Sequence, residues 1–229
     1  MHNRILGLML AIQTVGLSQY QSWIGADFTF KPLKKTKVEL GIENRNIGIT
    51  QWNRTFVKAK VSYKILQGVA LFSGYRIGLA PNNQSALNLK EKTFLHRPAL
   101  GIELNPMDWV NDQSRFSLGI TNQLQWNRGK YLRPNTMFRS KLSAMYDIKN
   151  FPISPFFSWE YFYNFHRDIT YTANEIIISG GTNAFRSFVG MEIELPKKQA
   201  IKLAVGRRTN YLSGQVRWIY SLNYSLSIK

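Results

Sequence analysis

Residues 215–229 read Gln-Val-Arg-Trp-Ile-Tyr-Ser-Leu-Asn-Tyr-Ser-Leu-Ser-Ile-Lys, and their side chains alternate in polarity. The even-numbered positions, from Val216 to Ile228, are all apolar or aromatic, and the odd-numbered positions are polar except for Ile219. This period of two predicts a β-strand with one apolar and one polar face. The run exceeds the about 5–6 residues of an average globular strand and suits a tilted membrane strand of about 9–11 residues with its rims. An amphipathic strand of a soluble sandwich would alternate in the same way, so the rest of the chain has to decide.

The composition limits the possible classes of site and partner. The 229 residues fit one barrel or one to two soluble domains. The chain has no cysteine, which excludes disulfides and thiolate metal sites. Beyond the N-terminus no run of about 18 apolar residues exists, so no helical membrane span is expected. The net charge of +17 suits an anionic partner, which could be nucleic acid, lipid or a solute.

The N-terminus has the layout of a secretory signal peptide. A short basic start, residues 1–4, precedes a mostly apolar run over residues 5–17, and Gly16 and Ser18 are small residues suited to cleavage after Ser18. We therefore predict a cleaved signal peptide over residues 1–18 and an exported domain over residues 19–229. The alternative is a buried N-terminal helix. Export makes lipid phosphate a better partner than nucleic acid, and we predict no nucleic-acid binding.

Alternation of the same kind recurs in about eleven segments, joined by links that are alternately short and long. Short turns at one end and longer loops at the other are typical of outer-membrane barrels. The predicted fold is all-β, a single antiparallel transmembrane β-barrel of 10–12 strands with a polar, charged lumen. An odd count conflicts with the even strand numbers of bacterial single-chain barrels. Either the longest link, residues 166–183, hides a strand, or residues 22–30 are not a full wall strand. The segments are 22–30, 37–45, 55–65, 69–79, 95–104, 115–126, 136–148, 156–165, 184–195, 201–208 and 215–229.

Ionised residues in these segments are sorted by parity. Every acid lies on the polar face of its segment, and Lys and Arg do the same except for Arg207, which is near a strand end. An Arg or Lys at the bilayer midplane costs about 2–4 kcal/mol, so this sorting is expected in a membrane. A soluble barrel reverses the arrangement, with apolar residues inside, and parity alone does not say which face is inner. The acids are Asp27, Glu39, Glu43, Glu103, Asp147, Glu160, Glu192 and Glu194.

The aromatic residues favour a membrane-facing apolar side. Tyr and Trp suit the interfacial belt of a membrane protein, and glycines on the polar side suit a crowded small lumen. A narrow barrel filled with paired ions is expected to be blocked. If any path through it exists, the excess of Lys and Arg over acids would favour anions. The apolar-face aromatics are Trp126, Trp159, Tyr161, Trp218, Tyr220 and Tyr224. The predicted lumen charge network comprises Arg76, Glu103, Arg139, Lys141, Glu160, Arg186, Glu192, Glu194, Lys202, Arg208 and Arg217.

Several segments together resemble a bacterial family over about the whole exported domain. They are Tyr-Arg at 75–76, Phe-Arg-Ser-Lys-Leu at 138–142 before Tyr-Asp-Ile at 146–148, and Pro-Phe-Phe-Ser-Trp-Glu-Tyr-Phe at 155–162. Phe-Arg at 185–186 before Gly-Met-Glu at 190–192, and the final Tyr-Ser-Leu-Asn-Tyr-Ser-Leu, belong with them. The chain is similar to the family called domain of unknown function 2490. This resemblance implies an outer-membrane barrel and adds no activity or site.

No pattern of residues predicts catalysis. Barrel lipases and lipid A deacylases resemble each other in using a His-x-Ser pair, whereas His96 and His166 are followed by Arg-Pro and Arg-Asp. A nucleophile needs a base within hydrogen-bond reach, and nothing local supplies one. We predict no enzyme activity, no catalytic residue, no cofactor and no metal site.

Two features have alternative interpretations. Glu192 and Glu194 share a face and could form an acid–base pair, but Lys202 and Arg208 on the next strand favour ion pairing. Arg128, Lys130 and Arg133, beside Tyr131, form a basic loop, weak as a nucleic-acid site. We predict that this loop contacts lipopolysaccharide phosphates at the outer rim.

These observations predict a small outer-membrane barrel with a structural or accessory role in the bacterial envelope. Its predicted partners are outer-membrane lipids and lipopolysaccharide, with other envelope proteins as a further class. A narrow anion-preferring pore is the first alternative function. A lipid-modifying outer-membrane enzyme is the second.

Overall fold

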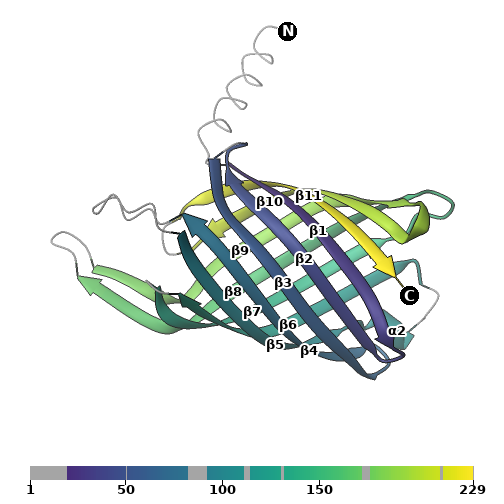
Figure 1. The fold of residues 1–229 in the computed structure, drawn as a ribbon, viewed down its shortest axis with the longest axis horizontal. Coiled ribbons are helices and arrows are strands. Elements are labelled where there is room, and N and C mark those ends of the chain that lie inside the picture. Colours follow the sequence, from purple (N-terminus) through teal and green to yellow (C-terminus); the bar gives the residue numbers. More distant parts are fainter. Residues whose placement is uncertain are drawn as a thin grey trace, which may run out of the picture.

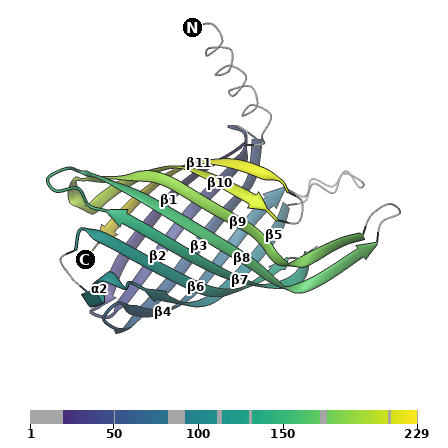
Figure 2. The same cartoon turned by 180° about the vertical axis from the view of Figure 1, so that it is seen from behind.

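The described part of the chain forms one closed β-barrel of eleven strands, each beside its neighbours in sequence (Figures 1 and 2). A computed structural model describes residues 20–49, 51–81, 92–110, 114–129, 132–171, 176–211 and 214–228. The predicted signal peptide lies outside these residues. Within them, no helix has the length and apolar character needed to cross a bilayer. The elements are β1 (Tyr20–Leu33), β2 (Thr36–Ile47), β3 (Gln51–Leu66), β4 (Val69–Pro81), β5 (Lys92–Leu104), α2 (Met107–Val110), β6 (Phe116–Gly129), β7 (Leu132–Tyr146), β8 (Ile153–Tyr171), β9 (Ile176–Leu195), η1 (Pro196–Lys198), β10 (Gln199–Asn210) and β11 (Val216–Ile228).

The barrel closes through a parallel pairing of its first and last strands. β1 and β11 pair from Tyr20 opposite Trp218 to Phe30 opposite Ile228, and they run side by side in Figure 1. The other ten pairings are antiparallel, as predicted. In an up-and-down barrel with an odd number of strands, the first and last strands point the same way, so closure has to be parallel. The suspicion that residues 22–30 form no full wall strand is wrong, because β1 spans 14 residues.

The prediction of a long link over residues 166–183 is also wrong. Residues 166–171 and 176–183 are the ends of β8 and β9, which are 19 and 20 residues long and stay paired as far as Tyr171 opposite Ile176. This hairpin extends past the neighbouring strands (Figure 2). The register shifts twice along it, after Phe162 and after Asn164. Each shift changes which residues share a face, so the period of two disappears from the sequence although the strands continue.

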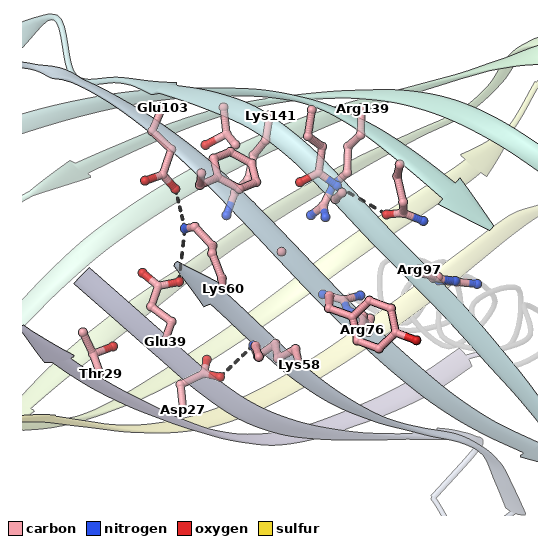
Figure 3. A pocket seen from close by; sticks show the side chains of 18 of the residues that line it. Asp27, Thr29, Glu39, Lys58, Lys60, Arg76, Arg97, Glu103, Arg139 and Lys141 are labelled. Atoms are coloured by element: carbon pink, nitrogen blue, oxygen red, sulfur yellow. Dashed lines mark hydrogen bonds and ion pairs between the residues drawn. The ribbon is translucent and has the colours of Figure 1, made fainter. Parts of the chain in front are cut away.

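Residues of the apolar face are exposed, whereas residues of the polar face are enclosed. Apolar-face residues such as Ile42, Val57 and Val189 are 50%, 55% and 63% exposed. On the polar parity, Glu160 and Arg186 are 3% and 7% exposed. The charged side chains therefore point into the bore, as Figure 3 shows for several of them, and the apolar side chains cover the outside.

Apolar side chains also point into the bore, although most inward-facing positions are polar. Trp23, Phe188 and Ile219 form a buried cluster inside the barrel. Ile219, the single apolar residue among the odd positions of the last strand, is fully buried there. The exception in the alternation of residues 215–229 is thus a packing residue of the bore.

Four phenylalanines of the bore each face a glycine directly across the neighbouring strand. At Gly78 of β4, an added Cβ would come within 2.6 Å of a ring carbon of Phe56, so only glycine leaves space for the ring. The glycines predicted for a crowded lumen thus make room for aromatic rings. The pairs are Phe56–Gly78, Phe72–Gly101, Phe156–Gly190 and Phe188–Gly206.

Gly78→Ala is expected to lower the free energy of unfolding by about 1–3 kcal/mol, because the new methyl group overpacks the bore against Phe56. Urea titration of the folded barrel, followed by tryptophan fluorescence, measures the change. Gly74→Ala, on the same strand, is the matched control, since its Cβ would meet only atoms at 3.7 Å or more. Equal destabilisation by the two variants would contradict the packing argument.

Candidate functional site

The candidate site is the charged interior of the barrel. A cavity of about 430 Å³ runs between side chains that project inward from most of the strands (Figure 3). The parity of the strands puts these side chains there, since every second residue must point inward. Its charged lining residues are Asp27, Glu39, Lys58, Lys60, Arg76, Arg97, Glu103, Arg139, Lys141, Glu192 and Lys202.

One part of the bore is crossed by salt bridges that reach over intervening strands. Lys60 Nζ on β3 lies between Glu39 on β2, at 3.1 Å, and Glu103 on β5, at 2.5 Å. Lys58, also on β3, binds Asp27 of β1 at 2.7 Å (Figure 3). Because β4 separates β3 from β5, and β2 separates β1 from β3, these contacts tie non-adjacent walls together. We call Asp27, Glu39, Lys58, Lys60, Glu103, Glu192 and Lys202 the ion-paired belt.

Glu160 on β8 holds two arginines from its flanking strands. Its carboxylate accepts hydrogen bonds from Arg139 Nη2 at 2.8 Å and from Arg186 Nε at 2.9 Å, and it also accepts one from Arg186 Nη2. The Glu160 side chain is 4% exposed. Both guanidinium groups also lie over the ring of Phe162, at 5.7 and 5.1 Å. This buried triad cross-links β7, β8 and β9.

The remaining predicted network residues divide into paired and unpaired groups. Glu192 binds Lys202 at 2.6 Å, as the sequence suggested. Glu194 and Arg208 were predicted to take part in this ion pairing, but within the described residues neither forms an ion pair. The register explains this, since Glu194 lies opposite Ala200 and is exposed, while Arg208 lies opposite Arg186. Of the rest, Lys141 faces Glu160 across the strands and Arg217 faces Arg208.

A second cavity, of about 230 Å³, is surrounded by arginines. It lies toward the end of the barrel opposite the β1–β2 turn, because Arg45 is near the end of β2 and Arg54 near the start of β3. No Asp or Glu is among its described lining residues. We call it the arginine chamber, after Arg45, Arg54, Arg76, Arg97, Arg139, Arg186 and Arg208.

The arginine chamber is built around an aromatic ring. The guanidinium groups of Arg45, Arg76 and Arg97 lie 4.8, 5.2 and 5.0 Å from the ring centre of Phe56, and that of Arg54 lies at 5.7 Å. Such cation–π contacts hold guanidinium groups in defined orientations. Phe56 and Arg54 are absent from the predicted network, although they lie two and four residues before Lys58 and so share its inward parity.

The outer wall carries a polar contact between two neighbouring strands. Tyr75 Oη lies 2.7 Å from Nδ1 of His96 on the exposed wall. No group of three or more His, Cys, Asp or Glu side chains suited to a metal ion occurs among the described residues. The side chains of His166 and Arg133, and all of Lys130, lie outside them. Arg128, the third member of the predicted rim site, is exposed.

Trp159 marks the aromatic part of the outer wall. Its ring stacks on Phe185 at 5.6 Å and on Tyr161 at 6.4 Å, on the two strands β8 and β9. This surface has the amphipathic aromatic character predicted for the apolar face. In comparisons with known proteins, no protein-family model and no curated protein matches the chain.

Proposed function

We propose that the protein is a small β-barrel of the bacterial outer membrane with a bore closed by ion pairs and a structural or accessory role in the envelope. The observation that carries this proposal is the segregation of the wall: large apolar side chains are exposed around the barrel, and ionised ones are enclosed. Soluble monomers rarely expose apolar patches larger than a few hundred Å², and a continuous apolar wall suits hydrocarbon.

The ion-paired belt supports a closed bore over an open pore. Lys60, with its two carboxylate partners, and the Lys58–Asp27 bridge occupy the interior across several strands. Ions passing through would have to displace these pairs, whose partners would then be left unpaired in a narrow space. The belt therefore favours a plug over the narrow anion-preferring pore.

Lipids and lipopolysaccharide are the proposed partners of the outer wall. The exposed Arg128 and the aromatic stack around Trp159 support contact with headgroups. The role is proposed to be non-catalytic; His96 contacts the phenol oxygen of Tyr75 on the exposed wall. The resemblance to domain of unknown function 2490 agrees with this proposal.

Purified protein inserted into planar bilayers is expected to give no stepwise current, because the salt bridges of the ion-paired belt cross the bore. An open general porin, reconstituted in parallel, is the positive control, and flotation with vesicles verifies insertion. A heat-dependent shift in gel mobility is expected as well, as for many membrane barrels. Regular anion-selective steps would overturn the closed bore, and failure to float with vesicles would overturn the membrane assignment.

A further inference from the structure

The arginine chamber carries far more positive charge than its acids neutralise. Only Glu43 and Glu160 form ion pairs with chamber arginines within the described residues: Glu43 binds Arg45 at 2.6 Å, and Glu160 binds Arg139 and Arg186. Seven arginines against two glutamates leave an excess of five positive charges. In the described part of the chain, Arg54, Arg76, Arg97 and Arg208 have no ion-pair partner, in contrast to the neighbouring belt.

The strand register places chamber arginines directly opposite one another, an arrangement in which their like charges repel. Three pairs face each other directly on adjacent strands: Arg45 with Arg54, Arg76 with Arg97, and Arg186 with Arg208. Like charges directly opposite each other destabilise a sheet. An anion between the guanidinium groups would convert this repulsion into attraction from several sides.

The chamber also contains buried hydrogen-bond donors without partners. Nε of Arg54, of Arg97 and of Arg139 are buried and have no hydrogen-bond partner in the described structure. These atoms come from β3, β5 and β7, so they border the chamber from separate strands. Buried polar groups are normally satisfied, and the exceptions call for a missing partner. Three of the four unsatisfied buried atoms of the chamber are thus donors that require an acceptor, and the fourth, Asn135 Oδ1, is an acceptor that a water molecule or a protonated oxyanion oxygen would satisfy.

From these observations we propose that the arginine chamber binds a small, multiply charged oxyanion of the phosphate class. The planar guanidinium fork matches the oxygen spacing of phosphate, and arginines held by Phe56 are oriented before the anion arrives. A volume of about 230 Å³ suits a single oxyanion with a few waters and excludes a polymer. Because the ion-paired belt adjoins the chamber, the anion is held in the bore and does not pass through it.

The oxyanion comes from solution and not from a lipid headgroup. The chamber is inside the barrel, and the exposed apolar wall separates it from surrounding acyl chains. Binding requires only the folded barrel, so it can be measured in uncharged detergent without any assumption about the membrane. This proposal therefore stands or fails separately from the proposed envelope role.

Isothermal titration calorimetry of the full chain in uncharged detergent, with inorganic phosphate as the probe, tests the proposal. Saturable binding of phosphate is expected, with no comparable heat from chloride at equal ionic strength. The double variant R54Q/R97Q removes two arginines whose Nε donors are unsatisfied and is expected to weaken phosphate binding at least about tenfold. The same variant without phosphate should melt no lower than the wild type, because it relieves two arginine–arginine contacts.

The matched control is R115Q/R207Q, which makes the same change in net charge at two exposed arginines outside the chamber and should leave binding unchanged. R208Q is a second chamber variant if the double variant does not fold, and it should also weaken binding. Wild-type affinity in either folded chamber variant, or equal binding of chloride, would overturn the proposal. Binding of a short-chain phosphatidic acid in the absence of phosphate binding would overturn the assignment to a dissolved anion.

Discussion

Replacing Glu160 by glutamine is expected to lower the free energy of unfolding by about 3–5 kcal/mol, the usual cost of breaking a buried ion pair from one side. The carboxylate accepts hydrogen bonds from Arg139 and Arg186, and its side chain is 4% exposed. Without its charge, two buried guanidinium groups would repel each other across the bore. Equilibrium urea unfolding in detergent or vesicles, followed through the six tryptophans, measures the loss.

Glu194→Gln is the matched control for this variant. Glu194 lies on β9, the strand that pairs with β8, but it is exposed and forms no ion pair within the described residues. Its neutralisation should change stability by no more than about 0.5 kcal/mol. A loss below about 1 kcal/mol for Glu160→Gln would show that the triad is solvated and contributes as weakly as a surface pair.

Val189→Arg is expected to destabilise the barrel in lipid vesicles by about 2–4 kcal/mol, the cost of an arginine at the bilayer midplane. Val189 is 63% exposed on the outer wall, between Phe157 of β8 and Val205 of β10. The long side chain would have to carry its charge through hydrocarbon. Reversible folding into vesicles, titrated with urea, gives the difference in free energy.

Leu66→Arg provides the comparison at the rim. Leu66 is also exposed, at the end of β3 beside a tight turn, where a charge reaches the headgroups at a cost of about 0–1 kcal/mol. In a membrane barrel, a new arginine should thus cost much stability in the middle of the wall and little at the rim. If both variants fold in water without loss of stability, the apolar wall does not face lipid.

Parity arguments predicted much of the bore correctly. Lys60, Glu103, Arg186 and Glu192 all point inward, because the side-chain period of a strand is a local property that needs no knowledge of the partner strand. Parity also places Glu194 in the network, whereas this residue is exposed and unpaired within the described residues. Its side chain has inward parity, but it lies close to the end of β9, where the wall stops and solvent begins.

Aromatic residues inside the bore were the main omission. Trp23, Phe56 and Phe188 were not assigned to the polar face, because polarity was used to define that face. Their signal was present in the glycines of the neighbouring strands, but pairing Phe56 with Gly78 requires the register, which the sequence does not state. Size complementarity across strands is therefore visible only when the strands are aligned.

By itself, the sequence determined that the chain is all-β and forms a barrel of about eleven strands, and it determined which side chains share a face. These properties follow from local alternation and from the spacing of turns. Only the tertiary structure decided the parallel closure of β1 on β11, the length of the β8–β9 hairpin and the direct opposition of Arg76 and Arg97. Closure and register join residues far apart in the chain, and their choice depends on the packing of the whole bore, which no local pattern encodes.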